Sequence, residues 1–356
     1  MTSLQWIGVA VFIVVLFGIG YKTGIGSRLV GPPKPRTFDW LATGTAPKSH
    51  PVYILTSYFE LIDGDLQTIP SDSVLMGKWG EAGSLQLIGA DRKPAPKALQ
   101  IRWFDLRSLK GYGGRLELDS AAMEARMEQG FRDEETDGIY PFKYLVVGVA
   151  PGGELALWGS GKSVTHLISM HALPEVPIPL SEMANDPAAT YESFAETYFA
   201  LHHPEDQLLV RDPATAVMPP NHWATLSKRY PYKITVVGEF AGDVLDMNFV
   251  NGEREWFDLS SKRKFSTSSL RADLPKPLSG ILNWSGPTGV KFYATLRFDQ
   301  SELAAAFEDL KLKSLTEPAV LELRPDESTL KVLVTLKVGD QVRSLEKVQS
   351  GIWARE

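Results

Sequence analysis

The chain has 356 residues, of which 44% are hydrophobic and 22% are charged, values typical of a folded globular protein. Its formal net charge of −6 disfavours a nucleic-acid-binding protein, because neutralising phosphates requires clustered Lys and Arg. The absence of cysteine excludes disulfides, thiol nucleophiles, zinc–thiolate sites and a lipid-bearing cysteine.

The N-terminal residues 4–21 are almost entirely apolar. At a rise of about 1.5 Å per residue, a helix of this length approaches the roughly 30 Å hydrocarbon core of a bilayer. Trp6 and Tyr21 lie at its two ends, where aromatic rings prefer the membrane interface. We therefore predict a single-pass inner-membrane anchor over residues 1–24. A cleaved signal peptide would carry a basic start and a small-residue cleavage site, and this segment has neither.

A proline-rich segment follows the predicted anchor. Such a composition favours a stiff, extended stalk, which we place at residues 25–47. Four basic residues follow the apolar span, whereas none precedes it, so the positive-inside rule favours a cytoplasmic location for the rest of the chain. These residues are Lys22, Arg28, Lys34 and Arg36.

The first predicted module covers residues 48–172, where apolar and polar residues alternate as they do in β-strands. Its strands are predicted at residues 51–61, 99–106, 114–118, 143–149 and 155–158. A helix is predicted at residues 120–129, with Gly130 as its C-terminal stop. The last two strands form a hairpin around the turn Ala150-Pro151-Gly152-Gly153.

Residues 173–228 are predicted to be a linker that contains a helix. Asn185-Asp186-Pro187 has the residue order of a helix start. Apolar residues three and four positions apart then form one helical face, made of Tyr191, Phe194, Tyr198 and Leu201. We expect this face to pack against a module rather than to dock on a partner.

The second predicted module, residues 229–356, repeats the order of the first at an offset of about 180 positions. The alignment pairs Pro51–Ile54 with Pro231–Ile234, Trp103 with Trp284, Tyr112 with Tyr293 and Asp119 with Asp299. Each aspartate precedes a helical segment, and Asp299 with Glu302 fits a capping box. The predicted fold class is α+β: two tandem, related, mainly antiparallel β modules, each with one helix, preceded by a single transmembrane helix.

Residues 156–163 fit the phosphate-loop pattern if Ala156 replaces the first glycine. In such a loop backbone N–H groups cradle phosphates, the lysine neutralises them and the serine holds Mg²⁺. A helix must follow, but the next residues contain two histidines and soon reach Pro174. We therefore keep a membrane-tethered nucleotide hydrolase, using Gly161, Lys162 and Ser163, only as an alternative function.

The six histidines include no pair at metal-ligand spacing, and no nucleophile motif is present. We therefore predict no catalytic residue, no metal and no cofactor.

An acidic run, Asp133-Glu134-Glu135-Thr136-Asp137, follows the first helix. A solvated loop is the simplest interpretation, but clustered carboxylates also accelerate association with a basic protein surface. Tyr112 lies among three glycines and is a second candidate contact, although an aromatic residue entering a strand usually belongs to the core. The candidate partner-binding residues are Tyr112, Asp133, Glu134, Glu135 and Asp137.

A tryptophan strand at Ile101–Phe104, a strand with Tyr112, and the turn Val147–Gly153 leading into Leu155–Trp158 occur together in the first module. With these motifs, residues 50–170 resemble the bacterial family called domain of unknown function 2931. The resemblance implies an envelope protein of the kind encoded beside type VI secretion effectors, including phospholipases, and an immunity role. It supplies no catalytic residues.

The leading hypothesis is a membrane-anchored, non-enzymatic periplasmic binding protein. It would act as an immunity protein that blocks a lipase-type effector of type VI secretion by occlusion. A non-enzymatic adaptor of an envelope machine is a further alternative. The basic residues after the span stand against a periplasmic location, although short uncharged N-terminal tails weaken that rule.

Overall fold

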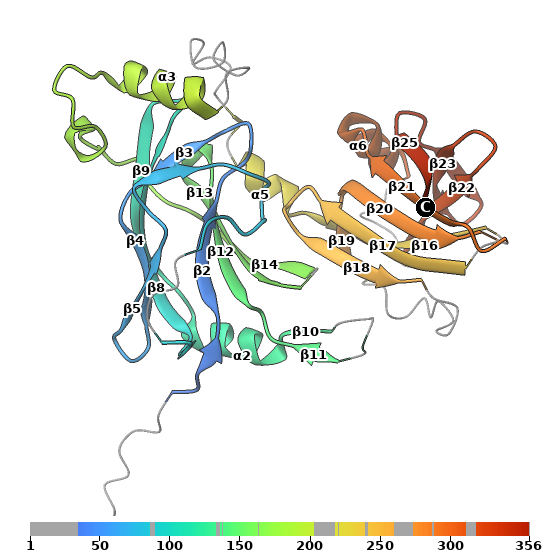
Figure 1. Cartoon of the computed structure of the whole chain (residues 1–356), viewed down its shortest axis with the longest axis horizontal. Helices are drawn as coiled ribbons and strands as arrows, with labels where there is room; N and C mark the ends of the chain where they lie inside the picture. The colour runs from blue at the N-terminus through green and yellow to red at the C-terminus, as the bar shows by residue number, and fades with distance from the viewer. Residues whose placement is uncertain are drawn as a thin grey trace, which may run out of the picture. The chain divides into compact units, whose positions relative to one another are not determined.

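The computed structural model describes residues 35–85, 90–132, 136, 138–162, 164–202, 218–219, 221–238, 241–259, 273–286, 288–310 and 318–355. The predicted anchor, residues 1–24, lies outside this set. Among the described residues, no helix is long and apolar enough to cross a membrane. Thr37–Glu356 form one compact unit, and strands predominate over helices in it, consistent with the α+β class (Figure 1).

Two sheets face each other in the first part of this unit. One contains, in spatial order, β2 (Leu41–Thr45), β12 (Tyr144–Val149), β13 (Glu154–Gly161) and β14 (Val164–Ala172). The other contains β5 (Leu66–Ile69), β4 (Ser57–Leu61), β8 (Pro96–Asp105), β3 (Val52–Ile54) and β6 (Ser73–Leu75), and β9 (Lys110–Glu117) also pairs with β8. Phe59, Trp103 and Leu157 lie in their shared core, because alternate residues of each strand face inward.

The second part is also built from two sheets. One contains β16 (Tyr232–Val236), β22 (Ala319–Asp326), β23 (Lys331–Val338) and β24 (Gln341–Ser344). The other runs through β18 (Arg254–Asp258), β17 (Ala241–Phe249), β20 (Pro277–Ser285), β21 (Lys291–Arg297) and β25 (Gln349–Arg355). Tyr232, Met247, Trp284 and Leu321 are among the side chains of their common core.

Shorter elements complete the described chain. The helices are α2 (Ser120–Gln129), α3 (Tyr191–His202), α5 (His222–Leu226) and α6 (Gln300–Asp309), with 3-10 turns η1 (Pro151–Gly153) and η2 (Leu180–Glu182). Three two-stranded ladders pair β1 (Phe38–Asp39) with β7 (Arg92–Lys93), β10 (Phe131–Arg132) with β11 (Ile139–Tyr140), and β15 (Arg229–Tyr230) with β19 (Leu274–Pro275).

The two parts pair their main strands by one scheme. β2 is parallel to β12, and β16 is parallel to β22. Antiparallel hairpins follow in both, β12–β13–β14 and β22–β23–β24, while α2 follows β9 and α6 follows β21 (Figure 1). This common scheme agrees with the predicted internal repeat, although the origin of both parts from one duplicated sequence stays a prediction.

Two of the predicted residue correspondences are wrong. Tyr112 pairs with Trp103, and Phe292 pairs with Trp284, so Phe292 rather than Tyr293 occupies the position of Tyr112. The ring centroids lie 5.7 Å apart in the first pair and 5.5 Å apart in the second. The counterpart of β16 is β2 rather than β3, because β3 pairs antiparallel with β8 in the opposite sheet. Neighbouring strands share an apolar alternation, so the sequence pattern does not identify the sheet.

The stalk prediction at residues 25–47 needs a correction. Residues 25–34 lie outside the described residues, but Leu41–Thr45 form β2, hydrogen-bonded in parallel to β12. Trp40 beside it is 1% exposed and donates its indole hydrogen bond to the carbonyl oxygen of Pro94 at 3.3 Å. Burial of this apolar segment outweighs its resemblance to a linker.

The linker helix starts later than predicted. α3 begins at Tyr191, where the backbone N–H of Thr190 and the backbone N–H of Ser193 each donate to the other's side-chain oxygen. Asp186 instead accepts a hydrogen bond from Ala188 N in a local turn. The predicted packing of the helix face is confirmed for Phe194, whose ring lies 5.4 Å from that of Tyr53. Leu201, in contrast, is 71% exposed.

The helix caps follow the prediction. Asp119 accepts from Ala122 N at 3.0 Å and Asp299 accepts from Glu302 N at 2.8 Å. The predicted capping box is not closed, because the Glu302 carboxylate instead accepts from the backbone N–H groups of Glu346 and Lys347. It thus fastens α6 to the chain that leads into β25.

The two parts meet where β14 contacts β18 through the bridge between Thr165 and Arg254, which makes one nine-stranded sheet. Gly80 and Gly252 approach with their backbones in contact, and both have positive φ angles, 83° and 84°. A Cβ on Gly80 would lie 2.2 Å from the carbonyl oxygen of Gly252. Only glycine fits this approach.

Replacing Gly80 with alanine should destabilise the protein by about 3 kcal/mol or more, because the added methyl clashes with Gly252 and the backbone is strained. Gly64→Ala is the matched control: its φ is also positive, at 96°, but nothing lies within 4 Å of the added Cβ. It should cost only about 1–2 kcal/mol. Urea unfolding followed by tryptophan fluorescence measures both losses, and equal losses would contradict the tight approach.

Candidate functional site

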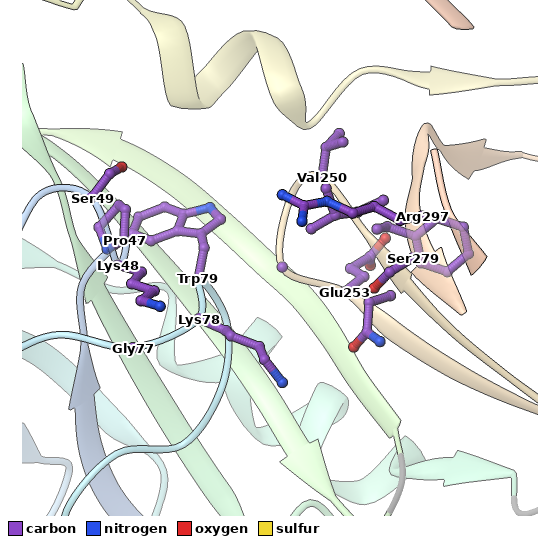
Figure 2. Close-up of a pocket in the computed structure, with 14 residues that line it drawn as sticks. Pro47, Lys48, Ser49, Gly77, Lys78, Trp79, Val250, Glu253, Ser279 and Arg297 are labelled. Atoms are coloured by element: carbon purple, nitrogen blue, oxygen red, sulfur yellow. The ribbon is translucent and has the colours of Figure 1, made fainter. Parts of the chain in front are cut away.

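A cavity of about 780 Å³ opens at this junction. Residues 47–49 and 77–79 line it from the first part, and the β17–β18 turn, the start of β20 and the end of β21 line it from the second. Figure 2 shows Trp79, Lys48 and Lys78 on one side, with Ser279 and Arg297 on the other. The volume falls in the range of small-molecule sites in proteins.

The charges that line the cavity are predominantly positive. Lys48 and Arg297 are exposed, and no ion pair joins either one to a described residue. Among the described residues, Lys78 has a long contact with Glu81, 3.8 Å between Nζ and Oε2, and its side chain is 76% exposed. Because exposed pairs at this distance contribute little, the described residues leave all three cations available to an anion.

Glu253 is the carboxylate that lines the cavity, and it is already neutralised. Its residue is 2% exposed, and it accepts hydrogen bonds from Leu167 N at 3.0 Å, from Asn251 Nδ2 at 3.2 Å and from the guanidinium of Arg229. A buried carboxylate persists only with such partners. Glu253 therefore joins β14 to the second part, and among the described lining residues no other carboxylate compensates the positive charge of the cavity.

Aromatic packing supports the wall at Trp79. Its ring centroid lies 4.8 Å from that of Trp158 and 5.0 Å from that of Trp223. Trp158 in turn donates from Nε1 to the carbonyl oxygen of Asn251 at 3.1 Å across the junction. A Cβ on Gly148 would lie 2.4 Å from the Trp158 ring and 2.7 Å from the Trp79 ring, so this glycine makes room for both.

Ser49 and His50 lie beside the cavity and superficially resemble a catalytic pair. Ser49 Oγ is 2.9 Å from His50 Nδ1, but Arg107 Nη1 is 3.3 Å from His50 Nε2. A guanidinium only donates, so Nε2 accepts and Nδ1 carries the proton toward Ser49. Burial first, and then the charges of Arg107 and His222, lower the pKa of His50 to about 4. This imidazole cannot take the serine proton, and the pair does not form a nucleophile.

Other buried polar groups near His50 hold the local fold. Asp105 accepts from Arg107 N at 3.0 Å and from Ser108 Oγ at 2.5 Å, while burial raises its pKa above the ordinary range. Glu154 accepts from Trp223 N at 3.2 Å and Ala224 N at 2.7 Å and thereby fixes α5. Among the described residues, no group of three or more His, Cys, Asp or Glu side chains could hold a metal ion.

The phosphate-loop alternative fails on geometry. Gly161 ends β13 and Lys162 occupies the tight turn into β14, with φ 50°, so a strand stands where the helix would have to begin. A Cβ on Gly161 would lie 2.7 Å from the ring of Phe131. This glycine therefore accommodates an aromatic neighbour, and Lys162 Nζ lies 5.9 Å from the Tyr140 ring centroid. Ser163 lies outside the described residues.

Tyr112 is a core residue rather than a partner contact. It is 7% exposed, and its ring packs on Trp103 between the two sheets. The prediction of Tyr112 as an anchor for a partner is therefore wrong. The other predicted contacts, Asp133, Glu134, Glu135 and Asp137, lie outside the described residues. β10 precedes these residues and β11 follows them, and the two strands pair in a short ladder. Ile139, in β11, is 73% exposed.

Sequence reasoning did not find the cavity residues. Lys48, Lys78 and Arg297 lie far apart along the chain, and single basic residues in polar loops carry no motif. The sequence feature that could have pointed to the cavity is Lys78-Trp79-Gly80. A large aromatic residue next to glycine in a polar loop indicates a specific packing contact.

Comparison with known proteins identifies one similarity. Residues 30–198 match the model of a family described as Protein of unknown function (DUF2931). This match supports the predicted family resemblance and extends it through β1 and most of α3. No curated protein and no solved structure matches the chain. Lys48, Lys78 and Trp79 lie within the matched residues, whereas Glu253 and Arg297 lie beyond them.

The pKa of His50 makes the stability dependent on pH. The imidazole takes a proton near pH 6.5 when unfolded but only near pH 4 when folded, so its contribution is present at neutral pH and is lost as the pH falls through this window. We expect a loss of about 2 kcal/mol between pH 7 and pH 5 from this residue. His50→Gln should unfold with a correspondingly smaller difference between the two pH values in urea titrations. An unchanged difference would contradict the buried, neutral imidazole.

Proposed function

We propose that the protein is a non-catalytic binding protein of the bacterial envelope that neutralises a toxic effector by occlusion. The proposal depends on one observation: the buried polar groups at the junction are engaged in holding the fold. Glu253, Glu154 and His50 all have hydrogen-bond partners that hold the fold. The cations Lys48, Lys78 and Arg297 face the cavity without a described acid or base poised to act on a substrate. Such a surface suits recognition rather than reaction.

Occlusion also fits the arrangement of the chain as two β parts in one unit. The two β parts belong to one compact unit, so a partner at the junction can reach both of them. A partner that contacts both sides would bury more area than either part offers alone, and stable interfaces need roughly 800 Å² per partner. The resemblance to the family favours an effector of type VI secretion, of the lipase type, as that partner.

Membrane attachment is part of the same proposal. Residues 4–21 would cross the inner membrane and hold both β parts in the periplasm, where an incoming effector first meets the target cell. The apolar span and its flanking aromatic residues support the attachment.

Neutralisation can be measured in cells that export a phospholipase-type effector of type VI secretion to the periplasm. We expect the full chain to restore growth and to abolish phospholipid hydrolysis. Lys162→Ala should protect equally well, because the lysine lies in a hairpin turn and not in a phosphate site. Arg297→Glu reverses a charge at the cavity and should reduce protection. Failure of the full chain to protect, or failure of Lys162→Ala alone, would overturn the proposal.

The orientation predicts which reporter is active at the C-terminus. An alkaline phosphatase fusion should be active and a green fluorescent protein fusion dark, because the phosphatase folds only in the periplasm. This expected result is the opposite of what the positive-inside rule predicts from the basic residues that follow the span. Fluorescence without phosphatase activity would place the β parts in the cytoplasm and exclude a periplasmic immunity role.

A further inference from the structure

The cavity at the junction combines cationic side chains with an apolar wall. Lys48 and Lys78 line one side and Arg297 lines the other (Figure 2). The chain as a whole carries a net charge of −6, so this local excess of positive charge runs against the average. A cleft lined by one sign of charge raises the local concentration of the opposite ion.

The cavity also has an apolar lining. Pro47, Trp79, Phe249, Val250 and Leu278 line the same cavity. Leu278 is 41% exposed and Trp79 is half-buried, so both present apolar surface to the cavity, whereas Phe249 and Val250 are 1% and 8% exposed. A small inorganic ion would leave this apolar surface in contact with water, and burying it adds affinity for a ligand that also has a hydrocarbon portion.

We propose that the junction cavity binds an amphiphilic phosphate, that is, a phosphate headgroup joined to an aliphatic chain. The headgroup lies between the lysines and Arg297, and the chain lies along Trp79 and Leu278. A phosphate suits cations on two sides of a cavity because its oxygens point in several directions, whereas the two carboxylate oxygens lie in one plane. The site uses residues of both β parts, so it exists only when the junction is formed.

The amphiphile site uses the same cavity cations as the proposed neutralisation, but amphiphile binding needs no protein partner, so the two can be tested independently. A chain that protects cells but binds no amphiphile refutes the site alone. A chain that binds the amphiphile but does not protect refutes the proposed function alone.

Isothermal titration calorimetry tests the site on the full chain held in neutral phosphatidylcholine nanodiscs, with empty nanodiscs as the blank. Octyl phosphate is the probe. Octyl glucoside supplies the same chain without charge, inorganic phosphate supplies the charge without the chain, and octanoate supplies a carboxylate headgroup. We expect octyl phosphate to bind at least about tenfold more tightly than each of these, and its affinity to fall as salt is added.

Arg297→Gln and Lys48→Gln should each weaken octyl phosphate binding about tenfold, the usual effect of losing one charge-assisted hydrogen bond. Both side chains are exposed, so the variants should fold, and unchanged circular dichroism checks this. Lys291→Gln is the matched control, since Lys291 is an exposed cation at the opposite end of β21 and does not line the cavity.

Four results would overturn the proposal. If octyl glucoside bound as tightly as octyl phosphate, the charge would not contribute to binding. If inorganic phosphate bound as tightly, the apolar lining would not contribute. Equal binding of octanoate would remove the assignment of a phosphate headgroup. Weakening by Lys291→Gln to the same extent as by Arg297→Gln would indicate general electrostatic attraction to the surface.

Discussion

The buried carboxylate of Glu253 is the interaction on which the arrangement of this protein depends. A carboxylate at 2% exposure is costly unless its lone pairs and charge are matched, and here the matching groups come from both β parts. Leu167 N belongs to β14 of the first part, while Arg229 and Asn251 belong to the second. Separating the parts would leave the carboxylate short of a partner, so the hydrogen bonds favour the closed junction and, with it, the cavity.

Glycines at the junction and in the first sheet serve packing. Gly80 and Gly252 allow two backbones to touch, and Gly148 leaves room for the rings of Trp79 and Trp158. The same reason explains Gly161, which faces Phe131. The glycine-rich residues 156–163 resemble a phosphate loop in the sequence, but in the structure their glycine at position 161 makes room for an aromatic ring against the strand. The aromatic rings in turn stiffen the wall of the cavity.

Near the junction, buried acidic and histidine side chains hold the fold, whereas basic side chains are exposed on the cavity. Glu154, Glu253 and His50, near the junction, are buried and hydrogen-bonded within the fold. The basic side chains Lys48 and Arg297 remain exposed on the cavity. An acidic protein thus presents a cationic recess, which suits the binding of an anion.

The sequence by itself determined the local structure: the capped helices after Asp119 and Asp299, the hairpin at Pro151–Gly153 and the family match of the first part. These depend on neighbours in the chain, such as a cap residue and the N–H three positions on. Only the tertiary structure decided that β2 is a sheet strand, that Tyr112 is buried and that Lys48 and Arg297 share a cavity. Those facts depend on burial and on contacts between distant segments, and single-sequence periodicity is the same for a strand in either sheet.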